Sequence, residues 1–349
     1  MKAAEFRSFW LSWRANRAFF FVFFFYILAV ASASAFWRIA VDLQIYSDAF
    51  LLFGLGVTVI LFAGISLRVM LERPPHLFPA LWDRLLANRL PERLIVGLPV
   101  ALALPLFFSL FTSMKGGISR IVPFYADSAL ITIDRAIHGG WDAWQILHPL
   151  LGTGPLTFAL NFLYNLWFIV MLVILFCVTF SVGNGRLRSQ YLVAFVLIWA
   201  LLGNVGATVF ASVGPAFVMP FYGDDTFSPL MNYLRATNAN YPVWALNAQG
   251  MLLANAALDG PRLGSGISAF PSLHVAVATL NAIYFGRFGG LLRGAGIMFL
   301  IAIQLGAVHL AWHYAVDGYA SILATPVIWI CAGWLSDLPR QPVTADVAG

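Results

Sequence analysis

The long apolar runs of this chain restrict its fold more than any other feature. A helix needs roughly 20 mostly apolar residues to cross a bilayer, and eight such runs follow one another along the 349 residues. Only 10% of the residues are Asp, Glu, Lys or Arg, against about 25% in a soluble domain. The sequence therefore predicts an all-α, polytopic integral membrane bundle of about eight transmembrane helices, at 18–37, 49–67, 94–113, 156–180, 191–211, 271–286, 294–311 and 315–335.

Basic residues predict how these helices are oriented. Lys and Arg are enriched in cytoplasmic loops, and alternate segments of the chain hold most of them: Lys2, Arg7, Arg14, Arg17, Arg68, Arg73, Arg84, Arg89, Arg93, Arg186, Arg188, Arg287, Arg293 and Arg340. The opposite segments hold only Arg38, Lys115, Arg120, Arg135, Arg235 and Arg262. Both termini are therefore expected in the cytoplasm. The net charge of +5 comes mostly from the orienting segments, so it implies no nucleic-acid partner.

Two non-cytoplasmic segments are unusually long, at about 114–155 and 212–270. Loops of this length in a compact protein usually carry function or short helices of their own. Helical apolar patterns at Ala126–His138 and Pro229–Thr237 predict two such helices, which we expect at the membrane surface.

The polar residues of the last third fall into two short motifs. Pro271-Ser272-Leu273-His274 opens the sixth predicted helix, where free backbone N–H groups and the Ser272 hydroxyl suit an anion. His313-Tyr314-Ala315-Val316-Asp317 lies between the seventh and eighth helices, on the same predicted side. If that segment is helical, His313 and Asp317 share one face at i, i+4. Asp317 would then fix the His313 tautomer and leave the other ring nitrogen free to attack, while His274 protonates a leaving oxygen. Two histidines, a carboxylate and an anion-binding helix end indicate phosphoryl transfer.

These two motifs resemble the second and third signatures of the type 2 phosphatidic acid phosphatase superfamily, written P-S-G-H and S-R-x5-H-x3-D. The resemblance is closest to the inositol phosphorylceramide synthase-like (inositolphosphotransferase-like) branch, with P-S-L-H or P-S-M-H and then H-Y-x2-D. It extends loosely to Gly214-Pro215, to Tyr164-Asn165-Leu166-Trp167 and to the region from Asp134 to Trp144. The resemblance implies a six-helix catalytic core, a phosphohistidine on His313, Asp317 as its orienting partner and His274 as the general acid.

This chain departs from the superfamily pattern in its cations. Gly306 and Ala307 stand at the Ser-Arg positions of the third motif, and no K-x6-R-P occurs. Phosphoryl transfer needs groups that stabilise the phosphoryl charge. We expect Lys115, Arg120 and Arg235 to bind the substrate with Ser272, although each also suits a solvated or headgroup-facing role.

Metal binding is the weaker interpretation of the same residues. His309 and His313 are spaced like zinc ligands on a helix, but Leu310 stands where a metalloprotease has Glu. The outer carboxylates fit either a divalent cation or, as we prefer, surface charges and helix caps; they are Asp127, Asp134, Asp142, Asp224 and Asp225. We expect no metal and no cofactor.

The sequence thus predicts three regions: a two-span region at 1–93, a catalytic membrane domain at 94–335 and a cytoplasmic tail at 336–349. The expected function is a metal-independent lipid phosphotransferase or phosphatase at the non-cytoplasmic leaflet, with transfer to a lipid hydroxyl slightly favoured over hydrolysis. The expected location is a bacterial inner membrane, with the site facing the periplasm. A lipid or solute transporter and an inactive scaffold are the alternatives.

Overall fold

The computed structural model describes residues 2–337 except 259, 263 and 265. All regular structure in this part of the chain is helical, as predicted. Each of the eight predicted runs forms a helix: α1 (Lys2–Trp37), α2 (Ser47–Leu71), α4 (Leu90–Gly116), α8 (Gly154–Thr179), α9 (Gly185–Leu197), α14 (Leu273–Phe285), α15 (Gly290–His309) and α16 (Ala315–Ser336). Arg340 and most of the expected tail, 338–349, lie outside the described residues.

Seven of these helices, in the part of the chain that the structure describes, are long and apolar enough to cross a membrane, counting α9 with its helical continuation to Val209. The exception is α14, with 13 residues. It begins late because Ser272 caps its first turn, so Pro271 and Ser272 belong to the preceding turn. The prediction of a polytopic helical membrane protein is confirmed.

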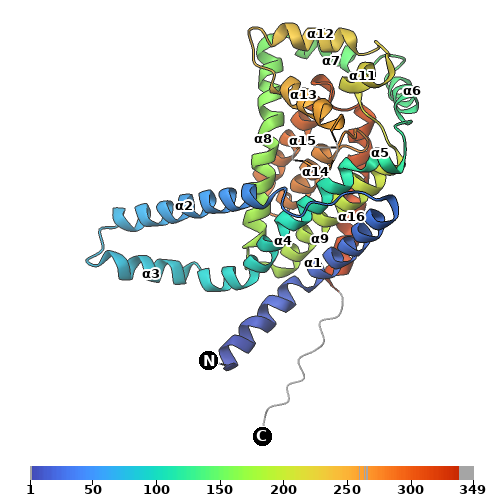
Figure 1. Ribbon diagram of the computed structural model, residues 1–349. Coiled ribbons are helices and arrows are strands. Elements are labelled where there is room, and N and C mark those ends of the chain that lie inside the picture. The colour runs from blue at the N-terminus through green and yellow to red at the C-terminus, as the bar shows by residue number, and fades with distance from the viewer. Residues whose placement is uncertain (1, 259, 263, 265, 338–349) are drawn as a thin grey trace.

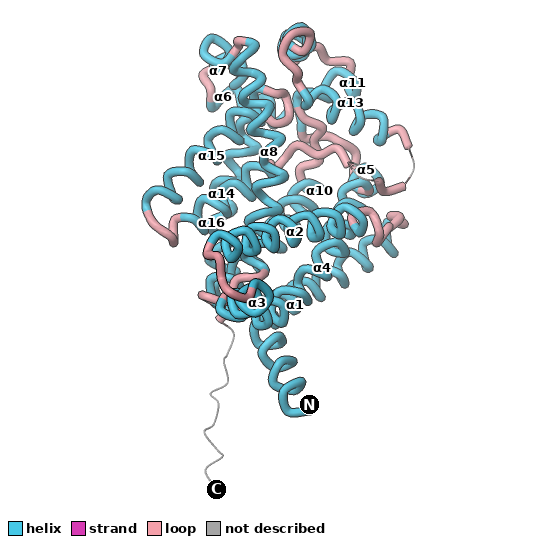
Figure 2. Tube along the Cα trace, turned by 90° about the vertical axis from the view of Figure 1, so that its left-hand side faces the viewer, coloured by secondary structure: helices cyan, strands magenta, loops and turns pink. Residues whose placement is uncertain are grey.

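Six helices pack around one core, and α1 lies against its outside (Figures 1 and 2). The core helices are α4, α8, α9, α14, α15 and α16, and α1 contacts α4 and α9. Large apolar side chains such as Phe107, Trp167 and Leu280 are fully buried between them. α9 continues through a π-helix, η1 (Ile198–Gly206), into α10 (Ala207–Val209). Tyr26 of α1 donates a 2.7 Å hydrogen bond to Asn204 within this π-helix, which ties α1 to the core.

Short helices cover one end of the bundle, opposite to the start of α1 and the end of α16 (Figure 1). Two of them, α6 (Asp127–Ile137) and α12 (Ser228–Thr237), confirm the helices predicted in the long segments. The pattern did not predict the others, which are α5 (Ile118–Ile121), α7 (Ala143–Leu151), η2 (Pro215–Phe217), α11 (Val218–Tyr222) and α13 (Trp244–Ala256). These short helices cover one end of the core, where α7 contacts α15 and α6 contacts α16.

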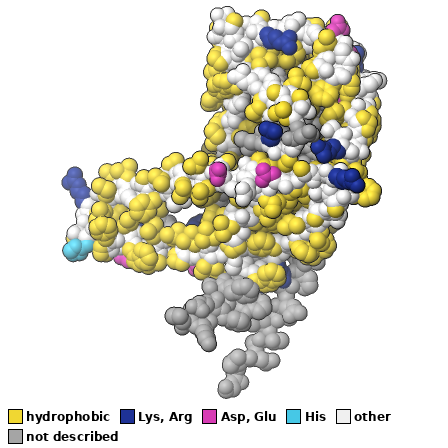
Figure 3. Space-filling model, viewed as in Figure 1, with side chains coloured by type: hydrophobic (Ala, Val, Ile, Leu, Met, Phe, Trp, Pro, Cys, Tyr) yellow, Lys and Arg dark blue, Asp and Glu magenta, His cyan; other side chains and the backbone are white. Residues whose placement is uncertain are grey.

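The arm formed by α2 and α3 (Leu77–Ala87) projects away from the bundle (Figure 1). Leu52 and Ile60 of α2 are exposed, as are Phe78 and Trp82 of α3. Hydrophobic side chains cover the arm and much of the visible face of the bundle, with few charges between them (Figure 3). Such a surface suits lipid rather than water.

Arg188 corrects one detail of the charge interpretation. The sequence placed it among the residues that orient the helices, but its side chain is buried. Its Nε donates to the Thr179 carbonyl at 2.9 Å, its Nη1 to Ala15 at 3.2 Å and its Nη2 to Val96 at 3.1 Å. Arg188 therefore joins α9 to α8, α1 and α4.

We predict that Arg188→Met lowers the stability of the purified protein by about 2–4 kcal/mol, since it leaves buried carbonyls without their donors. Thermal unfolding in detergent measures the change. Arg186→Met is the matched control, because Arg186 is exposed and pairs with Asp337 at the surface. Equal melting temperatures for the two variants would contradict the role given to Arg188.

Candidate active site

His313 lies in the turn that joins α15 to α16. The backbone N–H groups of Trp312 and His313 both donate to the Ala307 carbonyl at 3.0 Å, which holds this turn against the end of α15. Asp317, in the first turn of α16, accepts from the Tyr314 N–H at 3.0 Å and from the His313 ring at 3.3 Å. Both side chains are buried. The bond uses Nδ1 of His313, so Nε2 is left to face a substrate.

The prediction that His313 and Asp317 share the face of one helix is wrong in its geometry. Helix α15 ends at His309, Ala311 has a φ of +60°, and α16 begins only at Ala315. The two side chains meet because Asp317 caps the helix that His313 precedes. The two residues are four positions apart, as in the predicted contact, but they meet at a helix cap and not along one face of a helix.

His274 lies in the first turn of α14, against the aromatic face of α8. Its ring stacks on Tyr164 with centroids 4.6 Å apart and contacts Trp167 at 4.2 Å. The Trp167 indole N–H also donates to the His274 carbonyl at 2.9 Å. These contacts fix both the backbone and the ring of His274.

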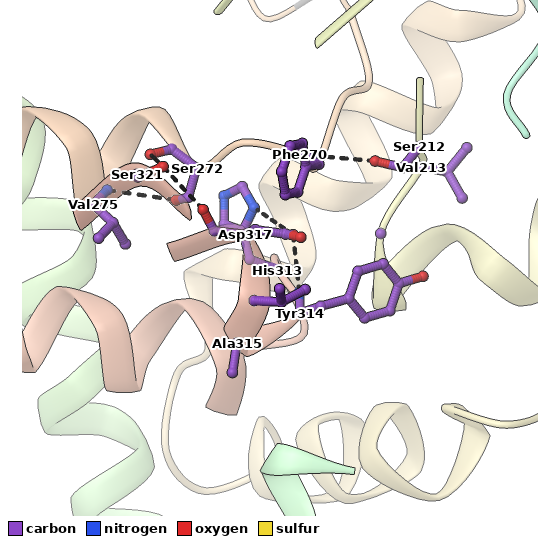
Figure 4. Close-up of polar contacts among 12 residues, drawn as sticks. Ser212, Val213, Phe270, Ser272, Val275, His313, Tyr314, Ala315, Asp317 and Ser321 are labelled. Carbon is purple, nitrogen blue, oxygen red and sulfur yellow. Dashed lines mark hydrogen bonds and ion pairs between the residues drawn. The ribbon is translucent and has the colours of Figure 1, made fainter. Parts of the chain in front are cut away.

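The starts of α14 and α16 are joined directly (Figure 4). The Ser272 N–H donates to the Asp317 carbonyl at 3.2 Å, and the Ser321 hydroxyl lies 2.9 Å from the carbonyls of both Ser272 and Asp317. As a result the His274 and His313 rings lie next to each other, edge to face, with centroids 6.2 Å apart and planes at 60°. Rings at this distance are close to contact, so both histidines can reach one substrate group bound beside them.

Ser272 is fully buried at the start of α14. Its Oγ accepts from the Val275 N–H at 3.4 Å, so it serves as the N-cap. Its hydroxyl proton stays available to a substrate oxygen. The first backbone N–H groups of a helix have no acceptor within the helix, because no turn precedes them. The N–H groups of Leu273 and His274 are in this position.

Two buried carboxylates of α6 hold the His313 turn from outside. Asp127 accepts from the backbone of Val213 and Gly214 and from the hydroxyls of Tyr222 and Tyr314, at 2.7–3.1 Å. Burial and the neighbouring Asp127 raise the pKa of Tyr314, which keeps this phenol a donor.

Asp134, two turns further along α6, accepts from the Val316 N–H at 2.9 Å. Burial raises its pKa, although the hydrogen bonds from Val316 and the charge of His138 oppose that shift.

Gly214 makes one of these contacts possible. It has a φ of +87°, and a Cβ there would lie 2.9 Å from the Trp312 carbonyl. Only glycine lets the Asp127 loop approach the His313 turn this closely.

The three predicted cations lie at different distances from the histidines. Lys115, at the end of α4, lines a cavity of about 250 Å³ together with Ser113, Ser119, Arg120 and Asn255. Lys115 is close enough to His274 to act on it electrostatically. Arg235 is exposed on α12, where it donates to Asn232 at 3.2 Å, and no contact among the described residues joins it to the histidines.

His309 belongs to a different cluster from His313. Its Nε2 lies 2.9 Å from the Thr157 hydroxyl, which in turn bonds the Tyr233 hydroxyl at 2.7 Å. Among the described residues, no group of three His, Cys, Asp or Glu side chains has the geometry of a metal site. Asp127, Asp134 and Asp142 are buried, and their carboxylates accept hydrogen bonds from backbone, tyrosine and arginine groups instead.

Sequence reasoning missed the residues that support the two histidines. Tyr164 and Trp167 were noticed only as part of a loose resemblance, which also included Asp134, and Asp127 and Asp134 were otherwise interpreted as surface charges, caps or ligands of a divalent cation. The useful signal was the seven-residue spacing of Asp127 and Asp134, which puts both carboxylates on one face of a helix.

The fold and site together define a polytopic membrane protein with a two-histidine centre at one end of its core. A model of the PAP2 superfamily matches residues 128–331, more than half of the chain and the whole of this centre. The chain therefore belongs to the PAP2 superfamily. Comparison with curated proteins and with solved structures gave no match. Membership supports a phosphatase or phosphotransferase activity on lipid phosphates, but the match does not select the inositol phosphorylceramide synthase-like branch.

We predict that Asp127→Asn destabilises the protein by about 1–3 kcal/mol, because an amide cannot accept from all four donors and its NH2 group meets two of them. Thermal unfolding measures the loss. Asp225→Asn, which changes an exposed carboxylate in the nearby loop, should have no effect. Unfolding temperatures that fall equally in both variants would argue against the Asp127 network.

Proposed function

We propose that this protein transfers a phosphoryl or phosphodiester group from a lipid through a phosphohistidine on His313. The observation that carries the proposal is the pair of adjacent rings, with centroids 6.2 Å apart, in which one histidine is oriented by a buried carboxylate. One histidine can then supply the nucleophile and the other the acid for a phosphorus atom bound beside both rings.

In the first step Nε2 of His313 attacks phosphorus. A P–N bond forms, the bond from phosphorus to the leaving oxygen breaks, and His274 gives its proton to that oxygen. Asp317 holds the His313 ring and balances the positive charge that develops on it. In the second step water or an alcohol attacks phosphorus, His274 takes its proton, and the P–N bond breaks. Each histidine is thereby returned to its starting state.

Phosphate binding is assigned to the start of α14 and to the basic cavity beside it. The Ser272 hydroxyl and the first N–H groups of α14 suit phosphoryl oxygens. Lys115 and Arg120 line the adjoining cavity, where an anionic headgroup fits. Arg235 is assigned only a weaker, long-range attraction, because it is exposed on α12.

A lipid hydroxyl as acceptor is the finer part of the proposal. It rests on the resemblance of Pro271-Ser272-Leu273-His274 and His313-Tyr314 to the inositol phosphorylceramide synthase-like branch. Simple hydrolysis uses the same first step and differs only in the second nucleophile. Adding a lipid alcohol to the assay separates the two, since a transferase moves the label to that lipid and a phosphatase releases it into water.

The proposed location is a bacterial inner membrane with both termini in the cytoplasm and the site at the periplasmic leaflet. The distribution of Lys and Arg supports this orientation. The proposed catalytic unit is 94–335, with 1–93 as an added two-span region.

We predict that His313→Ala abolishes release of phosphate or headgroup from lipid phosphates and phosphodiesters, and that His274→Ala reduces kcat by roughly 10²–10⁴-fold. The assay uses purified protein in mixed micelles, with and without a chelator, and activity should persist in chelator. His76→Ala, in the exposed turn between α2 and α3, is the control. Wild-type turnover in His313→Ala would remove the phosphohistidine mechanism.

We also predict that Lys115→Met raises KM by about tenfold or more, as expected for loss of a hydrogen bond to a charged group. Arg120→Met should have a smaller effect, because Arg120 is exposed. Arg287→Met removes an exposed charge at the other end of α14 and is the control. If Lys115→Met and Arg287→Met share one value of kcat/KM, the cavity is not the headgroup site.

A further inference from the structure

Tyr164 is a buried tyrosine whose hydroxyl has no hydrogen-bond partner in the structure. Only 3% of the residue is exposed. A buried hydroxyl without a partner costs about 1–3 kcal/mol, and phenylalanine in the same place avoids that cost. An orphaned donor at this depth therefore needs a reason, and an absent ligand is one.

The position of Tyr164 suits contact with a ligand bound at the two histidines. Its ring stacks on His274 with centroids 4.6 Å apart, and on Trp312 with centroids 6.3 Å apart and planes within 11°. Its hydroxyl is near enough to Asp317 for the two groups to interact electrostatically. Tyr164 thus contacts His274 and also Trp312, the residue next to His313.

Two further polar atoms of this site are buried and lack partners. They are the indole nitrogen of Trp312, a donor, and Oδ1 of Asp317, an acceptor. Trp312 precedes His313 in the chain and stacks on Tyr164, so the two orphaned donors belong to one aromatic stack. Unsatisfied polar atoms grouped around the two histidines are the arrangement expected of a polar subsite that binds a ligand.

Gly306 is the complement of Tyr164. A Cβ at position 306 would lie 3.1 Å from Cδ2 of Tyr164 and 3.5 Å from its Cβ. The Tyr164 ring therefore fills the space that a side chain at position 306 would need. Ala307, the next residue, is buried and offers only its carbonyl, which holds the His313 turn. Gly306 and Ala307 therefore supply no charged side chain, and the Tyr164 ring of α8 occupies the space beside them.

We propose that the Tyr164 hydroxyl and the Trp312 indole N–H are phosphate ligands that donate to non-bridging oxygens of the phosphoryl group while it is transferred to and from His313. The inference rests on the proposed function. Neutral donors suit this buried position, because the aromatic contacts around them exclude water and strengthen each hydrogen bond. Unlike an arginine, they require no buried charge when the site is empty.

The test measures binding of orthovanadate, a mimic of the phosphoryl group in transit, by calorimetry, together with kcat for a lipid phosphate. Tyr164→Phe keeps the stack and removes only the hydroxyl. We expect vanadate to bind about tenfold or more weakly and kcat to fall roughly 10²-fold, as for loss of one donor to a developing oxyanion. The melting temperature should stay the same or rise, because an unsatisfied hydroxyl is removed; a purely structural tyrosine would lose stability instead. Trp312→Phe should weaken vanadate binding in the same direction.

Tyr284→Phe is the matched control, since it removes a phenol from the far end of α14. Vanadate affinity and kcat within twofold of wild type in Tyr164→Phe would overturn the inference, and so would failure of the wild-type protein to bind vanadate. These results are distinguishable from failure of the proposed function, which shows as wild-type turnover in His313→Ala. Vanadate binding needs no turnover, so Tyr164 is tested whichever lipid proves to be the substrate.

Discussion

The starts of α14 and α16 are held together by hydrogen bonds, from the Ser272 N–H to the Asp317 carbonyl and from the Ser321 hydroxyl to the carbonyls of both residues. Each helix brings one histidine, so this junction sets the distance between His274 and His313. The surrounding elements act on the same junction: the aromatic residues of α8 fix His274, and the carboxylates of α6 fix the turn that carries His313. Because main-chain groups make the junction, it tolerates few insertions near either motif and little change in the crossing of α14 and α16.

The second constraint on the site is the small number of basic side chains near the two histidines. Charged side chains are expensive inside a membrane protein, and this chain buries Arg188 only by giving it three carbonyl partners at the end of the bundle away from the histidines. Lys115 is a basic side chain close enough to His274 to act on it electrostatically, and it lines the adjoining cavity. We infer a division of labour in which Lys115 and Arg120 attract the anionic headgroup, while helix N–H groups, Ser272 and the Tyr164–Trp312 stack bind the reacting phosphoryl oxygens.

Much of the fold was predictable because each apolar run is long and each becomes a helix. The contact between His313 and Asp317 was predictable because its spacing is local, although it forms through a helix cap and not along a helix face. The supporting residues were not predictable. Tyr164 and Asp127 reach the site only through the packing of α8 and α6 against it; the seven-residue spacing of Asp127 and Asp134 indicates one helix face, but not that this face meets the His313 turn. Arg188 illustrates the opposite error, since a basic residue at the end of an apolar run indicates orientation but can equally be a buried link between helices.

The most direct measurement of the central claim is to trap the covalent intermediate. Purified protein is mixed with a lipid phosphate labelled at phosphorus, quenched in base within the turnover time, and digested for peptide mapping. We expect an acid-labile, base-stable label on the peptide that contains His313, increased in His274→Ala if that variant slows the second step more than the first. A label on another residue, or sustained turnover with no label on His313, would contradict the mechanism.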